Sequence, residues 1–180
     1  MSVVAHGIRT LGVMGAGQMG TGIALVSALR AKVPVVIHDK SPEQVKKSFA
    51  LIDKLLAKDV SKGRLTAEDA KTVKDRISVA ENLRGLRDVD MVVEVRLCIA
   101  VEPMHQLNAS QAVSESLPIK QKIFGSFTSE LKPEAILATN TSSISITKIA
   151  ASAIPLGVSA ASEEGQTIAS RVVGESLGAD

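Results

Sequence analysis

The sequence contains no tryptophan and no tyrosine, and its only aromatic residues are three phenylalanines. Platforms on which bases or sugars stack are therefore not expected. A single cysteine, Cys98, excludes an internal disulfide framework and any CxxC metal or redox site. Cys98 and His105 together form too small a ligand set for zinc, so we expect no metal centre.

A strong net charge and long apolar runs are also lacking. The sequence has 21 Lys and Arg against 19 Asp and Glu, a formal net charge of +2, and no basic block, which argues against a nucleic-acid partner. No apolar run approaches the ~18–20 residues of a membrane span, and the N-terminal residues fit neither a secretory signal nor a transit peptide. We therefore expect a soluble, cytoplasmic protein without a membrane partner, although a mitochondrial or peroxisomal location stays open.

What is present is an alternation of short apolar runs with helical patterns. The 180 residues, 45% of them hydrophobic, suit one domain of ordinary size. Strands are predicted at residues 8–14, 33–38, 77–80, 90–94, 135–139 and 171–173. Helices are predicted at residues 18–30, 42–60, 66–76, 118–131 and 145–153, and a polar loop at 155–166. This order indicates an α/β fold of the Rossmann type, doubly wound, with a mostly parallel sheet and helices on both faces.

A glycine-rich stretch fits the pattern G-x-G-x-x-G. It follows the first predicted strand and opens the first predicted helix, which is the context that a dinucleotide-binding turn requires. The first glycine permits the tight bend, the second lets the backbone approach a pyrophosphate, and the third lets helix and strand pack closely, while the helix N-terminus supplies N–H donors. No Walker lysine follows, which excludes a P-loop. The predicted cofactor-binding stretch comprises Gly15, Ala16, Gly17, Gln18, Met19 and Gly20.

Asp39 ends the second predicted strand, 19 residues after Gly20. A carboxylate at this place accepts hydrogen bonds from the adenosine ribose hydroxyls and repels a 2′-phosphate, so NAD is favoured over NADP. Lys40, next to it, weakens this preference slightly. The alternative interpretation is an ordinary strand–helix turn with a solvated aspartate, and His38 is interpreted as a strand-end residue.

Together with these features, three stretches, VVE (92–94), AVSESLPIK (112–120) and ATNTSS (138–143), resemble the NAD-binding domain of 3-hydroxyacyl-CoA dehydrogenases. The short-chain 3-hydroxybutyryl-CoA dehydrogenases are the most similar, over residues 8 to 174. The resemblance implies NAD as cofactor, an acyl-CoA substrate, and oxidation of 3-hydroxyacyl-CoA to 3-oxoacyl-CoA in fatty-acid metabolism. The glycine pattern alone is shared with other dehydrogenases, so the latter two stretches make the assignment specific.

The resemblance also implies roles for single residues. Glu115 and Lys120 match positions near the nicotinamide half of NAD. Ser142 matches the residue that contacts both the cofactor and the 3-oxygen of the substrate, which makes it the candidate catalytic residue. Without the resemblance, Glu115 is a solvated acid at a helix start, Lys120 an exposed lysine, and Ser142 or Ser143 a cap of the following helix.

In the family, a general-base histidine in an H-F-F-N-P stretch follows a segment like 171–174, and a helical C-terminal domain forms the homodimer. Residues 175–180 here read ESLGAD. We therefore expect residues 1–174 to form the NAD-binding domain, 175–180 to be a non-family tail, and the histidine and the dimer domain to be absent. Without the base, the ~10²–10⁴-fold contribution of proton transfer is lost. We therefore expect this chain to be an inactive N-terminal fragment of such a dehydrogenase, and the alternatives are a non-catalytic NAD-binding module and another Rossmann 3-hydroxy acid dehydrogenase.

A second departure from the family pattern is the segment 95–111, which separates Glu94 from Ala112. Loops accept added length at modest entropic cost, so a genuine insertion is one explanation. We favour a translated intron, because the first and last residues of the segment are compatible with GT and AG boundaries, and the same origin would explain 175–180. In either case we expect Glu94 and Ala112 to lie close together.

Overall fold

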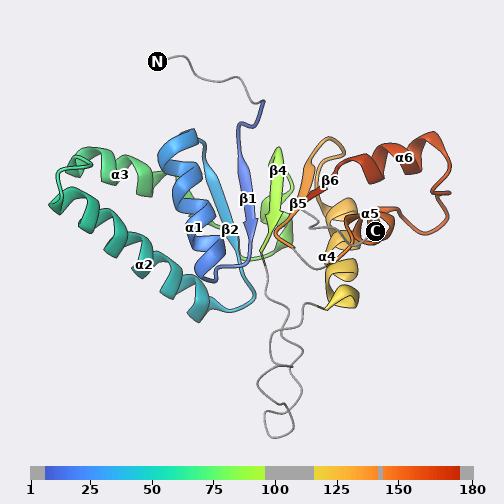
Figure 1. The fold of residues 1–180 in the computed structure, drawn as a ribbon, viewed down its shortest axis with the longest axis horizontal. Coiled ribbons are helices and arrows are strands. Elements are labelled where there is room, and N and C mark those ends of the chain that lie inside the picture. Colours follow the sequence, from blue (N-terminus) through green and yellow to red (C-terminus); the bar gives the residue numbers. More distant parts are fainter. Residues whose placement is uncertain (1–6, 96–115, 142–143, 175–180) are drawn as a thin grey trace, which may run out of the picture.

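The computed structural model describes residues 7–95, 116–141 and 144–174. At their centre is a six-stranded sheet in the order β3-β2-β1-β4-β5-β6, in which all neighbouring strands are parallel (Figure 1). The strands are β1 Leu11–Met14, β2 Val35–His38, β3 Ile77–Val79, β4 Met91–Glu94, β5 Ile136–Thr139 and β6 Val172–Gly174. The strand order reverses between β1 and β4, and sheets of this kind bind ligands beyond the carboxyl ends of the strands at such a reversal.

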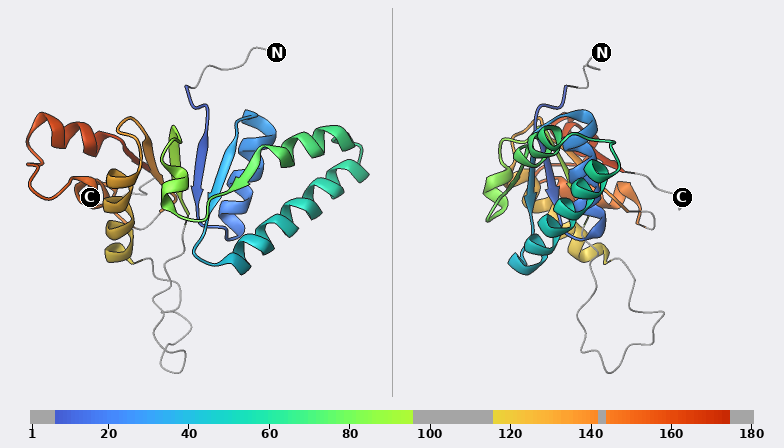
Figure 2. Two further views of the ribbon diagram at one scale, coloured as in Figure 1. Left: turned by 180° about the vertical axis from the view of Figure 1, so that it is seen from behind. Right: turned by 90° about the vertical axis from the view of Figure 1, so that its left-hand side faces the viewer.

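Helices cover both faces of the sheet. They are α1 Gln18–Val26, α2 Pro42–Ser61, α3 Ala67–Asp75, α4 Leu117–Glu130, α5 Ile146–Ala153 and α6 Glu163–Ser170. Figures 1 and 2 show α1, α2 and α3 on one side of the strands and α4, α5 and α6 on the other. One apolar core contains Val13 and Ile37, and a second contains Phe124 and Leu137. The predicted doubly wound α/β fold is confirmed.

The sequence predicts Ser41 and Thr66 as caps of the second and third helices, and the structure confirms both. Oγ of Ser41 accepts a hydrogen bond from the N–H of Gln44 at 3.2 Å, and Oγ1 of Thr66 accepts one from the N–H of Asp69 at 3.0 Å. Pro42 occupies the first turn of α2, where a helix has no use for its missing N–H. Both helices therefore begin where a side-chain oxygen replaces an absent backbone acceptor.

The polar loop predicted over 155–166 is wrong in its last residues, because α6 begins at Glu163. Oγ of Ser162 accepts a hydrogen bond from the N–H of Gly165 at 3.1 Å. Glu163 and Glu164 then lie in the first turn, where negative charge favours a helix. The signal for this helix is therefore a serine followed by two acids, which a search for apolar periodicity does not detect.

The first predicted strand and helix also differ in detail. β1 begins at Leu11, not at residue 8, because the N–H groups of Arg9 and Thr10 donate to Oδ2 of Asp90 at 2.6 and 2.9 Å. The helix predicted at 18–30 is α-helical as far as Val26 and continues as a π-helical turn, η1 (Ser27–Ala31). A 3-10 helix, η2 (Leu83–Leu86), lies before β4 and is not predicted. In the described part, no helix has the length and apolarity needed to cross a bilayer.

Candidate functional site

The bend between β1 and α1 is built on glycines. Gly15 has a φ of +118°, which residues with a Cβ rarely adopt, and its N–H donates to the carbonyl of His38 at 2.8 Å. A Cβ on Gly20 would lie 1.9 Å from the carbonyl oxygen of Gly15, so only glycine lets α1 start this close to the bend. A Cβ on Gly17 would meet no atom within 4 Å. The fold therefore requires the first and third glycines, whereas the second faces open space.

The first turn of α1 has N–H groups to offer to a ligand. Gly17 is its N-cap and makes no side-chain cap hydrogen bond, and the turn contains no acid, whereas α2, α3 and α6 have both a cap and an acid. First-turn N–H groups have no acceptor within their own helix, and the helix dipole is positive there. Gln18 and Met19 lie in this turn, and the side chain of Met19 is exposed. This end of α1 therefore suits an anion such as a phosphate.

The structure brings Asp39 to the glycine turn. Its Oδ2 accepts a hydrogen bond from the N–H of Ala16 at 2.8 Å, and its Oδ1 accepts one from the N–H of Ser41 at 2.9 Å. These two bonds hold the carboxylate in place, in contrast to the solvated aspartate of the alternative interpretation. A carboxylate offers about four lone-pair positions, so each oxygen keeps capacity for a further donor.

Two side chains outside the glycine motif also hold the turn. Gln44 is predicted to complete a capping box at the start of α2, but its side-chain amide donates instead to the carbonyl oxygen of Ala16 at 3.1 Å. Oγ1 of Thr21 lies 2.8 Å from the carbonyl oxygen of Gly17 and 2.8 Å from Oγ of Ser48 on α2. The turn, α1 and α2 therefore form one hydrogen-bonded unit.

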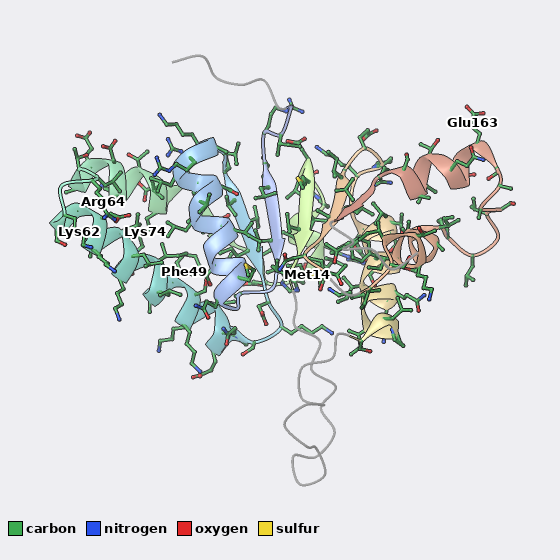
Figure 3. The ribbon with its side chains drawn as sticks, viewed as in Figure 1. Met14, Phe49, Lys62, Arg64, Lys74 and Glu163 are labelled. Carbon is green, nitrogen blue, oxygen red and sulfur yellow. The ribbon has the colours of Figure 1, made fainter. Side chains whose placement is uncertain are left out.

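A hollow of about 660 Å³ lies at the carboxyl edge of the sheet, beside the glycine turn. Its walls come from four separate segments, so no local motif predicts it. Met14 lies at the end of β1, between the two groups of helices (Figure 3). The lining residues are Met14, His38, Lys40, Glu81, Asn82, Leu83, Ile119, Lys122, Ile123 and Ser126. The hollow thus has the end of the sheet on one side and α4 on the other.

His38 is one of the buried side chains that line this hollow. Its Nδ1 lies 3.0 Å from the carbonyl oxygen of Ala80. Because a carbonyl only accepts, Nδ1 carries the hydrogen in this contact. The interpretation of His38 as a strand-end residue is confirmed, and the wall of the hollow is a position that the sequence did not reveal.

Lys120 is buried, so its interpretation as an exposed lysine is wrong. Its Nζ donates to Oε2 of Glu94 at 2.6 Å and lies 3.4 Å from Oγ1 of Thr139, whose hydroxyl donates to the same Oε2 at 2.8 Å. The side chains of Lys120 and Glu94 are 1% and 0% exposed. This buried cluster joins the start of α4 to the ends of β4 and β5. The contact of Lys120 with the nicotinamide half of NAD stays a prediction.

Glu115, Ser142 and Ala112 lie outside the described residues. The roles predicted for the first two, and the expected closeness of Ala112 to Glu94, therefore stay predictions. Asn140 follows β5 at the carboxyl edge of the sheet, and its N–H donates to the carbonyl of Glu94 at 2.9 Å. Among the described residues, no group of three or more His, Cys, Asp and Glu side chains is arranged to hold a metal ion.

Known proteins are similar to this chain in sequence. Residues 10–102 and 106–154 match the family described as 3-hydroxyacyl-CoA dehydrogenase, NAD binding domain. The chain is 43% identical over 145 residues to 3-hydroxybutyryl-CoA dehydrogenase of Bradyrhizobium diazoefficiens, which covers 80% of this chain and 43% of that protein. It is 32% identical over 152 residues to the peroxisomal bifunctional enzyme of Cavia porcellus, which covers 84% of this chain and 18% of that protein.

The fold is shared as well. The solved structure of (S)-3-hydroxybutyryl-CoA dehydrogenase PaaH1 from Ralstonia eutropha matches with a TM-score of 0.72 at 30% identity, over 93% of this chain and 48% of that chain. The chain thus spans less than half the length of these relatives. The matched domain is the NAD-binding domain, which confirms NAD as the predicted cofactor. With its glycine turn and the acid beside it, the chain belongs to the 3-hydroxyacyl-CoA dehydrogenase family, in which it corresponds to the NAD-binding domain.

Proposed function

We propose that this chain is the NAD-binding part of a dehydrogenase that oxidises 3-hydroxyacyl-CoA, of the 3-hydroxybutyryl-CoA type, to 3-oxoacyl-CoA in fatty-acid metabolism. The observation that carries the proposal is the glycine turn. The fold itself requires Gly15 and Gly20, but a Cβ on Gly17 would meet open space. Close approach of a diphosphate supplies the missing reason for the second glycine. The names of the bacterial relatives support the substrate class.

The described residues fit NAD. The diphosphate would lie at the first-turn N–H groups of α1, and the remaining lone pairs of Asp39 would accept from the adenosine ribose hydroxyls. The hollow would take the adenine, because Met14, Leu83 and Ile119 give it apolar walls and its volume lies within the ~300–1,000 Å³ of ligand pockets. The N–H of Ala16 serves Asp39 instead of the diphosphate.

Bound NAD accepts a hydride from C3 of the substrate. We propose that Ser142 contacts the 3-oxygen and that Glu115 and Lys120 lie near the nicotinamide half. A general base must remove the hydroxyl proton. His38 is not placed for this task, because its Nδ1 is bonded to Ala80 and its ring lines the part of the hollow assigned to adenine. We therefore propose that the 180-residue chain, assayed alone, binds NAD with little turnover.

We also propose a substrate class, an oligomeric state and a location for the complete enzyme. The substrate partner is an acyl-CoA, as the names of the bacterial relatives suggest. The complete enzyme is a homodimer, which rests on the family resemblance alone. The location is cytoplasmic, with a peroxisome as the alternative that the Cavia porcellus relative supports.

Titration of the folded 180-residue chain with NADH and with NADPH tests the proposal. The sequence lacks tryptophan and tyrosine, so the fluorescence of NADH can be followed with little signal from the protein. We expect saturable binding of NADH, at least about tenfold tighter than that of NADPH. The loss of NADH absorbance on addition of acetoacetyl-CoA then measures turnover.

Each outcome has a definite meaning. A folded sample that takes up no NADH contradicts the proposed cofactor site. Equal affinity for NADPH contradicts the role given to Asp39. Binding without turnover agrees with the fragment and with a non-catalytic NAD-binding module, and binding of acetoacetyl-CoA to the NADH complex separates the two. Rapid turnover would place a general base within these 180 residues and overturn that part of the proposal.

A further inference from the structure

The buried ion pair of Glu94 and Lys120 is not explained by the stability of the fold. Lys120 shares its face of α4 with Ile123 and Phe124, which are three and four residues further on and lie in the apolar core. In such surroundings, an ion pair is on balance no more stabilising than apolar side chains of similar volume, because both charges lose their water. Replacing Glu94 by leucine and Lys120 by methionine should therefore not lower the stability of the fold.

What an ion pair does supply is direction. The bond from Nζ of Lys120 to Oε2 of Glu94 is 2.6 Å long, and the hydroxyl of Thr139 donates to the same oxygen. Charge-assisted hydrogen bonds fix both distance and angle, whereas apolar contacts tolerate sliding. At the start of α4, the N-cap Ser116 makes no side-chain cap hydrogen bond. The ion pair is thus a directional link between this end of α4 and the sheet.

The pair also joins a strand next to one wall of the hollow to the helix that forms the other wall. In the sheet, Glu94 is in register with Met14 on one side and Thr139 on the other. Met14 lines the hollow and directly precedes the glycine turn. On the helix, Lys120 follows Ile119, which lines the hollow from the other side. A link from Glu94 to Lys120 therefore sets the distance between the sheet wall and the helix wall.

We propose that Glu94 is a positioning residue for the dinucleotide site, which acts through Lys120 to hold the α4 wall of the hollow at a fixed distance from the end of β1. This inference rests on the proposed function, because it takes the ligand of the hollow to be the adenosine half of NAD. An apolar pair at the two positions keeps the fold but lets the wall shift. Affinity for the ligand then falls while stability does not.

The double variant Glu94→Leu/Lys120→Met tests this separation. We expect its unfolding midpoint in urea to equal or exceed that of the wild type. We expect the Kd values for NADH and for ADP-ribose to rise by about tenfold or more. ADP-ribose lacks the nicotinamide ring, near which Lys120 itself is proposed to lie, so the loss of affinity for ADP-ribose measures the effect on the adenosine half alone. A purely structural role predicts that affinity stays unchanged whenever the midpoint does.

A matched control removes an ion pair that also joins two elements but lies away from the hollow. Nζ of Lys74 on α3 is 2.7 Å from Oδ1 of Asp53 on α2, and Figure 3 shows Lys74 in the group of helices opposite α4. The variant Asp53→Asn/Lys74→Met is expected to bind NADH and ADP-ribose like the wild type. A loss of affinity in this control equal to that of the Glu94 variant would overturn the proposal.

Wild-type affinity in a folded Glu94→Leu/Lys120→Met protein would also overturn it. A folded wild-type chain that binds no NADH would overturn both this inference and the proposed function, so the wild-type titration tells the two failures apart. If the double variant does not fold, Thr139→Val decides, because it removes only the hydroxyl that donates to Glu94. We expect this variant to raise the Kd values for NADH and ADP-ribose by about two- to tenfold. Unchanged Kd values would count against the proposal.

Discussion

The two edges of the sheet use their polar groups for opposite purposes. At the amino edge, Asp90 accepts hydrogen bonds from the N–H groups of Arg9 and Thr10 and from Lys132. Arg171 donates to the carbonyl of Lys132 at 3.1 Å. These contacts occupy backbone groups and connect strand ends to loops. At the carboxyl edge, the first turn of α1 has no side-chain cap and no acid, and a hollow lies beside it.

This difference separates stability from binding. The amino edge satisfies its backbone groups within the protein, so changes there should alter the free energy of unfolding and leave ligand affinity unchanged. The carboxyl edge keeps N–H donors and space for a ligand. Changes there should therefore alter ligand affinity and leave the free energy of unfolding unchanged. Gly20 should affect both stability and binding, because it packs α1, the helix that carries the N–H donors, against the bend.

Gly20→Ala is expected to have the largest effect and to break the division between the edges. The new Cβ would lie 1.9 Å from the carbonyl oxygen of Gly15, a backbone atom that cannot move without shifting α1. We expect a loss of more than about 3 kcal/mol in the free energy of unfolding and no measurable NADH binding. Urea unfolding and NADH titration check both. A wild-type unfolding midpoint would show that α1 can begin further from the bend at no cost.

Gly17→Ala sharpens the division, because its Cβ meets only open space. We expect the free energy of unfolding to change by less than about 1 kcal/mol and the Kd for NADH to rise at least about tenfold, because the methyl group occupies the approach of the diphosphate. Gly22 on the same helix also has nothing within 4 Å and gives the matched control. Gly22→Ala should stabilise α1 by about 0.5–1 kcal/mol and bind NADH normally.

Asp39→Ala is expected to raise the Kd for NADH by about tenfold, because the ribose hydroxyls lose their acceptor. The same change removes the charge that repels a 2′-phosphate, so the ratio of NADPH to NADH affinity should move toward one. Asp59, further along α2 and 3.4 Å from Arg64, provides a control of the same residue type. Asp59→Ala should leave both affinities as they are, and an unchanged ratio in Asp39→Ala would refute the role of the acid.

Asp90→Asn tests the amino edge and should have the smallest effect. The hydrogen bond from Lys132, helped by the N–H groups of Arg9 and Thr10 and opposed by burial, lowers the pKa of Asp90 from 3.8 to about 2. A carboxyl group whose pKa is lower in the folded state stabilises the folded state fully at pH values above the pKa of the unfolded state. This stabilisation is lost as the pH falls through the pKa of the folded state.

At pH 7 we therefore expect Asp90→Asn to lower the free energy of unfolding by about 1 kcal/mol, because water near the surface screens the pair. The difference from the wild type should shrink between pH 3.8 and about 2. Urea unfolding as a function of pH measures it. NADH affinity should be unaffected, and a difference that persists below pH 2 would show that the carboxylate charge is not its cause.

The parts of the site that the sequence predicts are those that act over a few residues. The glycine turn is a local backbone conformation, and Asp39 follows from the length of one strand–helix–strand unit. The burial of Lys120 could not be predicted in this way. Its partner Glu94 is 26 residues earlier and Thr139 is 19 residues later, so only the folded sheet brings them together. The hollow is hidden for the same reason.

The fold was predictable because its apolar strands alternate with helical patterns, and errors arose where polar side chains decide. The apolar pattern predicts Arg9 and Thr10 as part of the first strand, but in the structure their N–H groups donate to the carboxylate of Asp90. The start of α6 depends on a hydroxyl at Ser162 and on two acids, and neither adds to apolar periodicity. The position of Gln44 in the sequence predicts a capping box, but its side-chain amide donates to the carbonyl oxygen of Ala16, a contact that only the folded structure shows.

The contact of Gly20 with Gly15 has a consequence for the encounter with the coenzyme. Backbone packing, Gln44 and Thr21 all hold the bend from inside the protein, so its shape does not depend on an occupant. The diphosphate of an arriving dinucleotide meets a bend whose described residues are already held in place by the protein. Its contacts with this bend are then not offset by the entropy of ordering the bend.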